Sequence, residues 1–119
     1  VVRQSTDTLA IEEPNLAAAV RFIRENASNP ITVDDILREV PASRRWLERQ
    51  FAKILGRSPA EEIRRVHLER AKRLLMETDM PIPAVAKASG YGSPEYLSYA
   101  FKAETGLTPL KYRSRVRAR

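Results

Sequence analysis

Residues 43–59 read SRRWLERQFAKILGRSP, and residues 93–109, fifty positions later, read SPEYLSYAFKAETGLTP. The two stretches share Ser, Leu, Phe, Gly and Pro at the same five places, and Ser58 is matched by Thr108. A serine can cap the start of a helix, and a glycine can end one in the left-handed conformation. Leucine and phenylalanine four positions apart lie on one helical face. The chain therefore contains an internal repeat, and each copy is predicted to be a capped helix of about thirteen residues.

The helical faces opposite the shared leucine and phenylalanine differ between the two copies. This face carries Arg45, Glu48, Arg49 and Ala52 in the first copy, and Glu95, Ser98, Tyr99 and Lys102 in the second. The repeat thus keeps its buried side and changes its exposed side. This pattern indicates one scaffold that presents two different recognition surfaces.

Capping signals and helical periodicity extend from both copies along the chain. Helices are predicted at 14–27, 32–40, 43–56, 58–78, 82–89, 93–105 and 108–114. A short helix, a tight turn and a capped longer helix form a helix-turn-helix pattern, which occurs twice. The predicted fold class is all-α, with seven helices and two helix-turn-helix subdomains joined by a long connector helix. The predicted segments are a linker remnant (1–13), a first subdomain (14–57), the connector (58–78), a second subdomain (79–114) and a frayed basic tail (115–119).

Composition narrows the classes of function. The 119 residues suit one ordinary domain, or two very small ones that share a core. Lys and Arg number 21 against 15 acidic residues, and a pI near 10.1 favours a polyanionic partner. No cysteine is present, which excludes disulfides and cysteine-based zinc sites. No apolar run is long enough to predict a membrane-spanning helix, and no signal peptide is visible. Because the chain starts at Val1 without a methionine and its first dozen residues are polar and uncapped, we expect a fragment of a longer protein.

Charge distinguishes the two predicted recognition helices. Residues 42–57 hold five basic residues and one acidic residue, a net charge of +4, whereas residues 92–108 hold one basic and two acidic residues.

A connector of about 19 residues would be about 28 Å long, near the ~34 Å repeat of successive major grooves. The predicted base contacts are Arg45, Glu48, Arg49, Glu95, Ser98 and Tyr99. The predicted phosphate contacts are Ser43, Arg44, Lys53, Arg57, Ser93, Tyr96 and Lys102.

Several short motifs resemble one known family. They are AKRLL at 71–75, IPAVA at 82–86, GY at 90–91, FK at 101–102, GLTP at 106–109 and YR at 112–113. From residue 14 to about 113, the chain resembles the DNA-binding domain of AraC/XylS-type bacterial transcription regulators. The resemblance implies a seven-helix domain with two recognition helices, normally joined to a separate effector-sensing domain. Residues 34–51 and 93–101 look most like xylose-operon activators, which implies a sugar-sensing partner domain.

The sequence departs from the family pattern at two places. His67 stands where many relatives carry arginine, and Pro94-Glu95 puts an acidic residue at the groove end of the second recognition helix. Both departures leave the base contacts open.

The predicted function is sequence-specific double-stranded DNA binding by a bacterial transcription regulator, an activator in the cytoplasm at the nucleoid. Two recognition helices would enter adjacent major grooves of a promoter or operator, from a monomer or a weak oligomer. RNA polymerase is a predicted partner, and no cofactor or metal is expected. The alternative is a helical interaction module that docks on an acidic partner such as a polymerase subunit. An enzyme is disfavoured, since no nucleophile, metal or cofactor site is apparent.

Some polar and aromatic residues have ordinary structural explanations. His67, the single histidine, is predicted to be a packing or surface residue, and Trp46 is predicted to pack between helices, with DNA contact as the alternative. Acidic pairs at 34–35 and 61–62 fall in first helical turns, where they complement the helix dipole. The basic residues Arg64, Arg65, Arg70, Lys72 and Arg73 are expected on the connector surface, some of them reaching phosphates.

Overall fold

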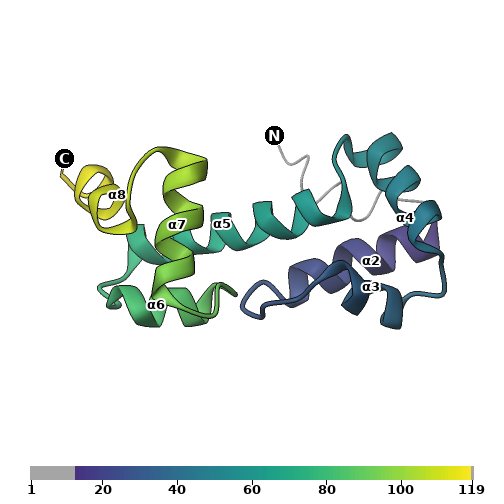
Figure 1. Cartoon of the computed structure of the whole chain (residues 1–119), viewed down its shortest axis with the longest axis horizontal. Coiled ribbons are helices and arrows are strands. Elements are labelled where there is room, and N and C mark those ends of the chain that lie inside the picture. Colours follow the sequence, from purple (N-terminus) through teal and green to yellow (C-terminus); the bar gives the residue numbers. More distant parts are fainter. Residues whose placement is uncertain (1–12, 119) are drawn as a thin grey trace. The chain divides into compact units, whose positions relative to one another are not determined.

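The computed structural model describes residues 13–118, and their secondary structure is entirely helical (Figure 1). The helices are α2 (Pro14–Glu25), α3 (Val33–Glu39), α4 (Arg44–Gln50), α5 (Pro59–Glu77), α6 (Ile82–Ala88), α7 (Pro94–Thr105) and α8 (Pro109–Val116). A π-helical turn, η1 (Phe51–Leu55), continues α4. The predicted all-α class with seven α-helices is confirmed for the described part of the chain. The predicted linker remnant lies outside the described residues except for Glu13.

Both copies of the repeat start with the predicted serine cap. Ser43 Oγ accepts a hydrogen bond of 3.0 Å from the Trp46 backbone N–H. Ser93 Oγ accepts the equivalent bond, 3.1 Å long, from the Tyr96 backbone N–H. Each hydroxyl thereby satisfies an N–H group that has no partner within its own helix. The local sequence therefore fixes where α4 and α7 begin.

Both copies also end at the predicted glycine, but by different hydrogen bonding. Gly56 and Gly106 lie in the left-handed region, with φ of 75° and 82°. The Gly106 N–H donates to Lys102 O at 2.8 Å, which is an α-helical spacing. The Gly56 N–H donates at 3.1 Å to both Ala52 O and Phe51 O, and the second of these bonds spans five residues. The first copy is therefore not α-helical throughout as predicted, because its last turn is widened to a π-helix.

The outermost helices differ from their predicted bounds. α2 ends at Glu25, two residues early, because Asn26 closes it: its side-chain amide donates to Phe22 O at 2.9 Å. At the other end, Glu13 Oε1 accepts hydrogen bonds from two backbone N–H groups of the first turn. α8 continues to Val116, past the predicted end near 114.

The described chain divides into two compact units. Unit 1 contains residues 13–26 and Ile31–Arg64, and unit 2 contains Ala27–Pro30 and residues 65–118. The division falls within α5, so that the first part of this helix belongs to unit 1 and the remainder to unit 2. The sequence-based division, which treats the connector as a segment separate from both subdomains, stays a prediction.

Unit 1 packs α2, α3, α4 and the start of α5 around apolar side chains. The buried apolar residues are Leu16, Ala19, Val20, Ile23, Ile36, Val40, Leu47, Phe51 and Ile63. The predicted capping arrangements fix two of its helix starts. The Asp35 carboxylate accepts from the Thr32 N–H at 2.8 Å. Glu61 and Ser58 exchange bonds, since the Ser58 N–H donates to Glu61 Oε1 at 2.8 Å and the Glu61 N–H donates to Ser58 Oγ at 3.1 Å.

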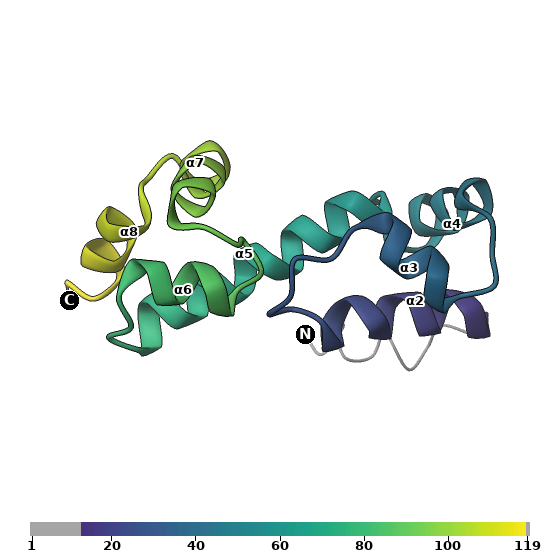
Figure 2. The same cartoon turned by 60° about the horizontal axis from the view of Figure 1, so that its bottom comes forward.

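Unit 2 has a core of its own, built from α5, α6, α7 and α8 (Figure 2). Its buried residues are Ala71, Leu75, Val85, Ala86, Leu97 and Phe101. Tyr112 of α8 meets Phe101 edge to face, with ring centroids 5.1 Å apart. Arg70 Nε donates to Ala88 O at 2.6 Å and so caps the end of α6. The shared leucine and phenylalanine are thus fully buried in both copies.

Two arginines close the C-terminal end of α5. Arg113 Nε donates to Leu75 O at 3.0 Å. Arg117 donates to Thr78 O at 2.9 Å and pairs with Asp79 at 2.8 Å. Cations near the last carbonyls of a helix complement its dipole. The predicted fraying of the basic tail is therefore wrong at Arg117.

No helix within residues 13–118 combines the length and apolar character that crossing a membrane requires.

Candidate nucleic-acid interface

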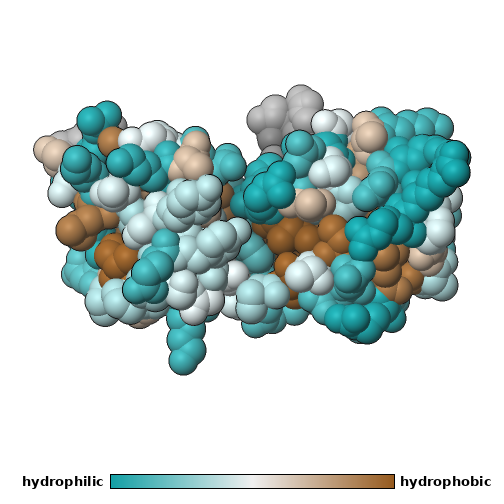
Figure 3. All heavy atoms as spheres, in the orientation of Figure 1, coloured by the Kyte–Doolittle hydropathy of each residue, from teal (hydrophilic) through white to brown (hydrophobic). Residues whose placement is uncertain are grey.

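The three predicted base-reading residues of the first copy share the exposed face of α4. Arg45, Glu48 and Arg49 are all exposed, and Leu47 beneath them is fully buried. The serine cap and the buried leucine together fix the rotation of the helix, so these side chains point to solvent. On the face shown in Figure 3, the surface over α4 is strongly hydrophilic. The arrangement offers two guanidinium groups and one carboxylate to an external partner.

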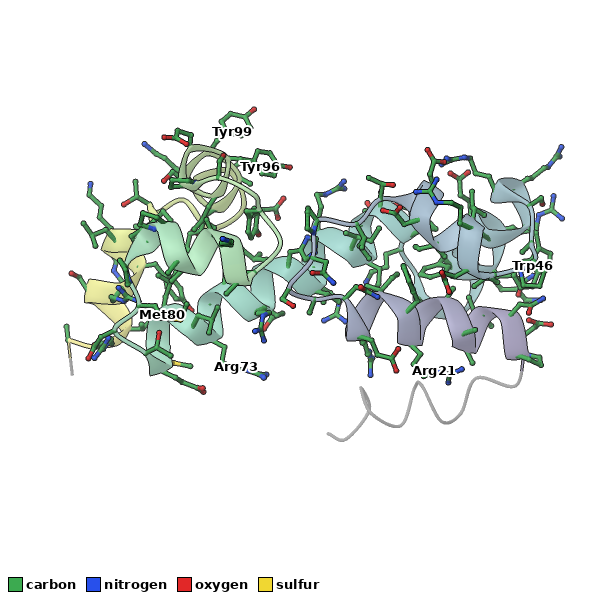
Figure 4. All side chains as sticks on the ribbon, turned by 90° about the horizontal axis from the view of Figure 1, so that it is seen from below. Arg21, Trp46, Arg73, Met80, Tyr96 and Tyr99 are labelled. Atoms are coloured by element: carbon green, nitrogen blue, oxygen red, sulfur yellow. The ribbon has the colours of Figure 1, made fainter. Side chains whose placement is uncertain are left out.

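The predicted base-reading residues of the second copy form a less charged surface on α7. Tyr99 is 74% exposed, Glu95 is exposed and Ser98 is half-buried. Figure 4 shows Tyr96 and Tyr99 projecting outward from α7, and the α7 surface in Figure 3 is of intermediate hydropathy. This surface offers hydroxyl groups and aromatic rings, and it carries little charge.

Most of the predicted phosphate contacts are accessible. Ser43, Arg44, Lys53, Tyr96 and Lys102 are exposed, whereas Ser93 and Arg57 are half-buried. The two serine hydroxyls already accept the helix-capping bonds. Arg44 pairs with Asp34, and both side chains are largely exposed, so solvent competes for this ion pair.

Arg57 is placed differently from the other basic candidates. Its Nη1 donates at 2.8 Å to Oε1 of Glu62, whose side chain is 1% exposed. This ion pair joins the loop after the first copy to the first turn of α5. Part of the Arg57 guanidinium is therefore engaged inside unit 1, which makes Arg57 the weakest of the phosphate candidates.

His67, predicted to be a packing or surface residue, is a buried packing residue and makes a specific hydrogen bond. It is 8% exposed, and its Nε2 lies 2.8 Å from Asn29 O in the Ala27–Pro30 segment of unit 2. Because a carbonyl oxygen only accepts, Nε2 is the donor. No group of three or more potential metal ligands comes together in residues 13–118. Trp46, for which packing was predicted, is half-buried.

The surroundings of Asp35, Glu61 and Tyr91 shift the pKa values of these side chains. The Thr32 backbone N–H lowers the pKa of Asp35, and the Ser58 backbone N–H lowers the pKa of Glu61. Burial raises the pKa of Tyr91 to about 12, with smaller contributions from Tyr96 and Glu104. Both carboxylates therefore stay ionised as helix caps, and Tyr91 stays a neutral phenol at ordinary pH.

Comparison with known proteins places this architecture in a family. A family model described as a helix-turn-helix domain matches residues 36–115. Among solved structures, the C-terminal domain of AraT, a response regulator from Geobacillus stearothermophilus, has a TM-score of 0.81 at 29% identity. That match covers 87% of this chain and 86% of the other. The chain belongs to the AraC/XylS family of helix-turn-helix domains.

Another solved domain of similar fold was determined in complex with DNA. It is the DNA-binding domain of AdpA, described as a global transcriptional factor, and the structure contains a target DNA. Its TM-score to this chain is 0.80, at 29% sequence identity. The match covers 87% of this chain and 93% of that one.

Curated relatives of the AraC/XylS domain are transcription regulators. The regulator ArgR of Pseudomonas aeruginosa PAO1 is 34% identical over 109 residues, 92% of this chain and 33% of the relative. The xylose operon regulatory protein of Escherichia coli K12 is also 34% identical, over 95% of this chain and 29% of the relative. The chain thus spans about a third of the length of these relatives. Equal identity to two differently named regulators leaves the predicted sugar effector a prediction.

Proposed function

We propose that this domain binds double-stranded DNA sequence-specifically as part of a bacterial transcription regulator. The observation that carries the proposal is the duplicated, serine-capped helix whose polar face is exposed in both copies while its leucine and phenylalanine are buried. The likeness to the AdpA DNA-binding domain, which was solved with its target DNA, supports the same conclusion.

The first copy supplies most of the affinity under this proposal. Arg45 and Arg49 suit bidentate hydrogen bonding to guanine, and Glu48 suits acceptance from the amino group of cytosine. Arg44 and Lys53 contact phosphates, which makes binding salt-dependent through counterion release. Excess positive charge in residues 42–57 also favours approach to a polyanion.

The second copy contributes discrimination more than charge. Ser98 and Tyr99 read bases by hydrogen bonding and by contact with thymine methyl groups, and Glu95 reads cytosine. Ser93 and Tyr96 contact phosphates at the start of α7, helped by the positive end of its dipole. Lys102 contacts a phosphate from the last turn of the helix.

We propose that one domain reads two successive major grooves. α5 has 19 residues, which corresponds to about 28 Å of helix. Successive grooves on one side of B-DNA repeat about every 34 Å. Two recognition helices in one chain, of different polarity, therefore suit two different half-elements that lie one helical turn apart.

In the whole protein we propose an activator that recruits RNA polymerase and carries a separate effector-sensing domain, acting in the bacterial cytoplasm at the nucleoid. The coverage of about a third of each curated relative leaves room for such a domain. A sugar effector is the corresponding proposal for the sensing domain.

A second candidate function is docking of an acidic partner on α8. Its outer face forms an open groove lined by Leu107, Thr108, Leu110, Lys111, Ser114, Arg115 and Ala118. Leu110 is 62% exposed, and residues 107–118 include four basic and no acidic residues. An apolar centre with a basic rim suits an acidic amphipathic segment, such as one on a polymerase subunit.

Two classes of variant test DNA recognition. Binding to a preferred duplex and to a scrambled duplex is measured at several salt concentrations for wild type, Arg49→Ala and Lys53→Ala. We expect Arg49→Ala to remove part of the preference for the preferred duplex. Lys53→Ala should weaken binding to both duplexes and reduce the slope of log K against log salt concentration by about 1, the value for one lost phosphate contact. Equal wild-type affinity for all duplexes would contradict sequence-specific binding and favour the α8 docking function.

A further inference from the structure

A chain of contacts in unit 2 connects the turn after α2 to the recognition helix α7. His67 Nε2 donates to Asn29 O at 2.8 Å. The His67 ring lies 6.0 Å from the Tyr91 ring, and the Tyr91 ring lies 5.8 Å from that of Tyr96, centroid to centroid. Both pairs are tilted by about 50°, within the range of favourable aromatic contacts.

The local backbone is built closely around His67. Gly90, between α6 and Tyr91, has a φ of 84° and is buried. A Cβ on Gly90 would lie 2.5 Å from His67 Nε2 and 2.9 Å from Asn29 O. Only a glycine therefore allows the turn to approach both groups. The Tyr91 N–H donates to Ala86 O at 3.0 Å, which ties the same turn to α6.

The far end of this chain of contacts reaches the surface assigned to DNA. Tyr96 is 52% exposed and occupies the first turn of α7, where its backbone N–H is already held by Ser93. Its ring has a partner on one side, Tyr91, which is itself half-buried. Tyr91 therefore packs against one side of the Tyr96 ring, and His67 packs against Tyr91.

We propose that His67 is a positioning residue for DNA recognition by α7, acting through Tyr91 on Tyr96. This inference rests on the proposed function, and it assigns a role to a buried side chain that does not touch DNA. His67 donates through one side of its ring to a fixed carbonyl and presents the ring to Tyr91. The orientation of Tyr96 is thereby settled before DNA binds, which reduces the entropy lost on binding.

The test compares His67→Ala, Tyr96→Ala and the double variant on two duplexes. One duplex carries both half-elements. In the other, a scrambled sequence replaces the half-element whose base preference is lost in the Tyr99→Ala variant. We expect His67→Ala to weaken binding to the complete duplex roughly tenfold, equivalent to about 1.4 kcal/mol. Because Tyr96 contacts phosphate in the proposed function, His67→Ala should weaken binding to the duplex without the second element by a similar factor and leave the base preference read by Tyr99 in place. The double variant should bind no more weakly than Tyr96→Ala, because both changes remove one interaction.

A purely structural role would give another result. If His67→Ala still weakens binding when Tyr96 is already Ala, or changes the base preference read by Tyr99, the positioning role through Tyr96 is wrong. Tyr91→Leu provides a second variant that keeps His67 and Asn29 intact, and it should show the same loss, which should again be absent when Tyr96 is already Ala. Wild-type binding without any sequence preference would instead overturn the proposed function itself.

Discussion

Arg57 and Glu62 form an ion pair across the junction between the first copy of the repeat and α5. The Arg57 Nη1 to Glu62 Oε1 distance is 2.8 Å, and the Glu62 side chain is 1% exposed while that of Arg57 is 34% exposed. A buried carboxylate is costly unless it is paired and hydrogen-bonded. The pair therefore stabilises the start of α5 against the end of the recognition helix.

Replacing Arg57 with Ala should lower the free energy of unfolding by roughly 1 to 3 kcal/mol, because it takes a partner from a buried carboxylate. Urea denaturation measures the change. Arg44→Ala is the matched control, since its pair with Asp34 is exposed and should contribute less than about 1 kcal/mol. Unchanged stability with weaker DNA binding would make Arg57 a phosphate contact.

Replacing Arg49 with Ala should cost roughly 1 to 3 kcal/mol of binding free energy and relax the preference at one base pair. Its exposed position on α4 predicts little change in stability. Fluorescence anisotropy with duplexes that vary one base pair at a time measures this preference. A uniform loss on every duplex would assign Arg49 to phosphate.

Glycine substitutions should separate backbone strain from close packing. Ala at Gly56 or Gly106 meets nothing within 4 Å, so only the positive φ is strained. We expect each to cost about 1 to 2 kcal/mol of folding stability. Gly90→Ala should cost clearly more, because its Cβ would also overlap His67 and Asn29. Thermal and urea unfolding of the three variants measure the order, and equal losses would contradict the packing at Gly90.

The Glu61 cap should make stability depend on pH. The folded pKa of Glu61 lies below its ordinary value of 4.5, because the Ser58 N–H stabilises the carboxylate. Its contribution is therefore complete above pH 4.5 and is lost as the pH falls through the folded pKa. The stability difference between wild type and Glu61→Ala, measured by urea unfolding, should be largest at neutral pH and shrink in acid. A difference that grows in acid would contradict the cap.

Features set by neighbouring residues could be predicted from the sequence. Helix capping acts within four residues at Ser43, at Ser93 and in the Ser58-Pro59-Ala60-Glu61 run. The starts of the corresponding helices could therefore be predicted. Gly56 and Gly106 marked the helix ends because the left-handed conformation favours glycine. The buried side of each copy followed from the four-residue spacing of Leu and Phe.

Contacts between distant segments could not be predicted in the same way. The π-turn depends on which carbonyl the Gly56 N–H reaches, and no residue type announces that choice. His67 and Asn29 are 38 positions apart, so their bond appears only once the turn is folded. The sequence did carry a signal for the burial of Glu62. This residue follows Pro59 by three positions and adjoins Ile63, so it lies toward the buried side of α5.

The central claim is that one chain reads DNA with two versions of the same helix. Selection of binding sites from random duplexes, repeated at two salt concentrations, tests it most directly. We expect two different enriched elements about one helical turn apart, with the element lost in Arg49→Ala distinct from the one lost in Tyr99→Ala. Enrichment of a single short element that only Arg49→Ala affects, or of no sequence at all, would contradict the account.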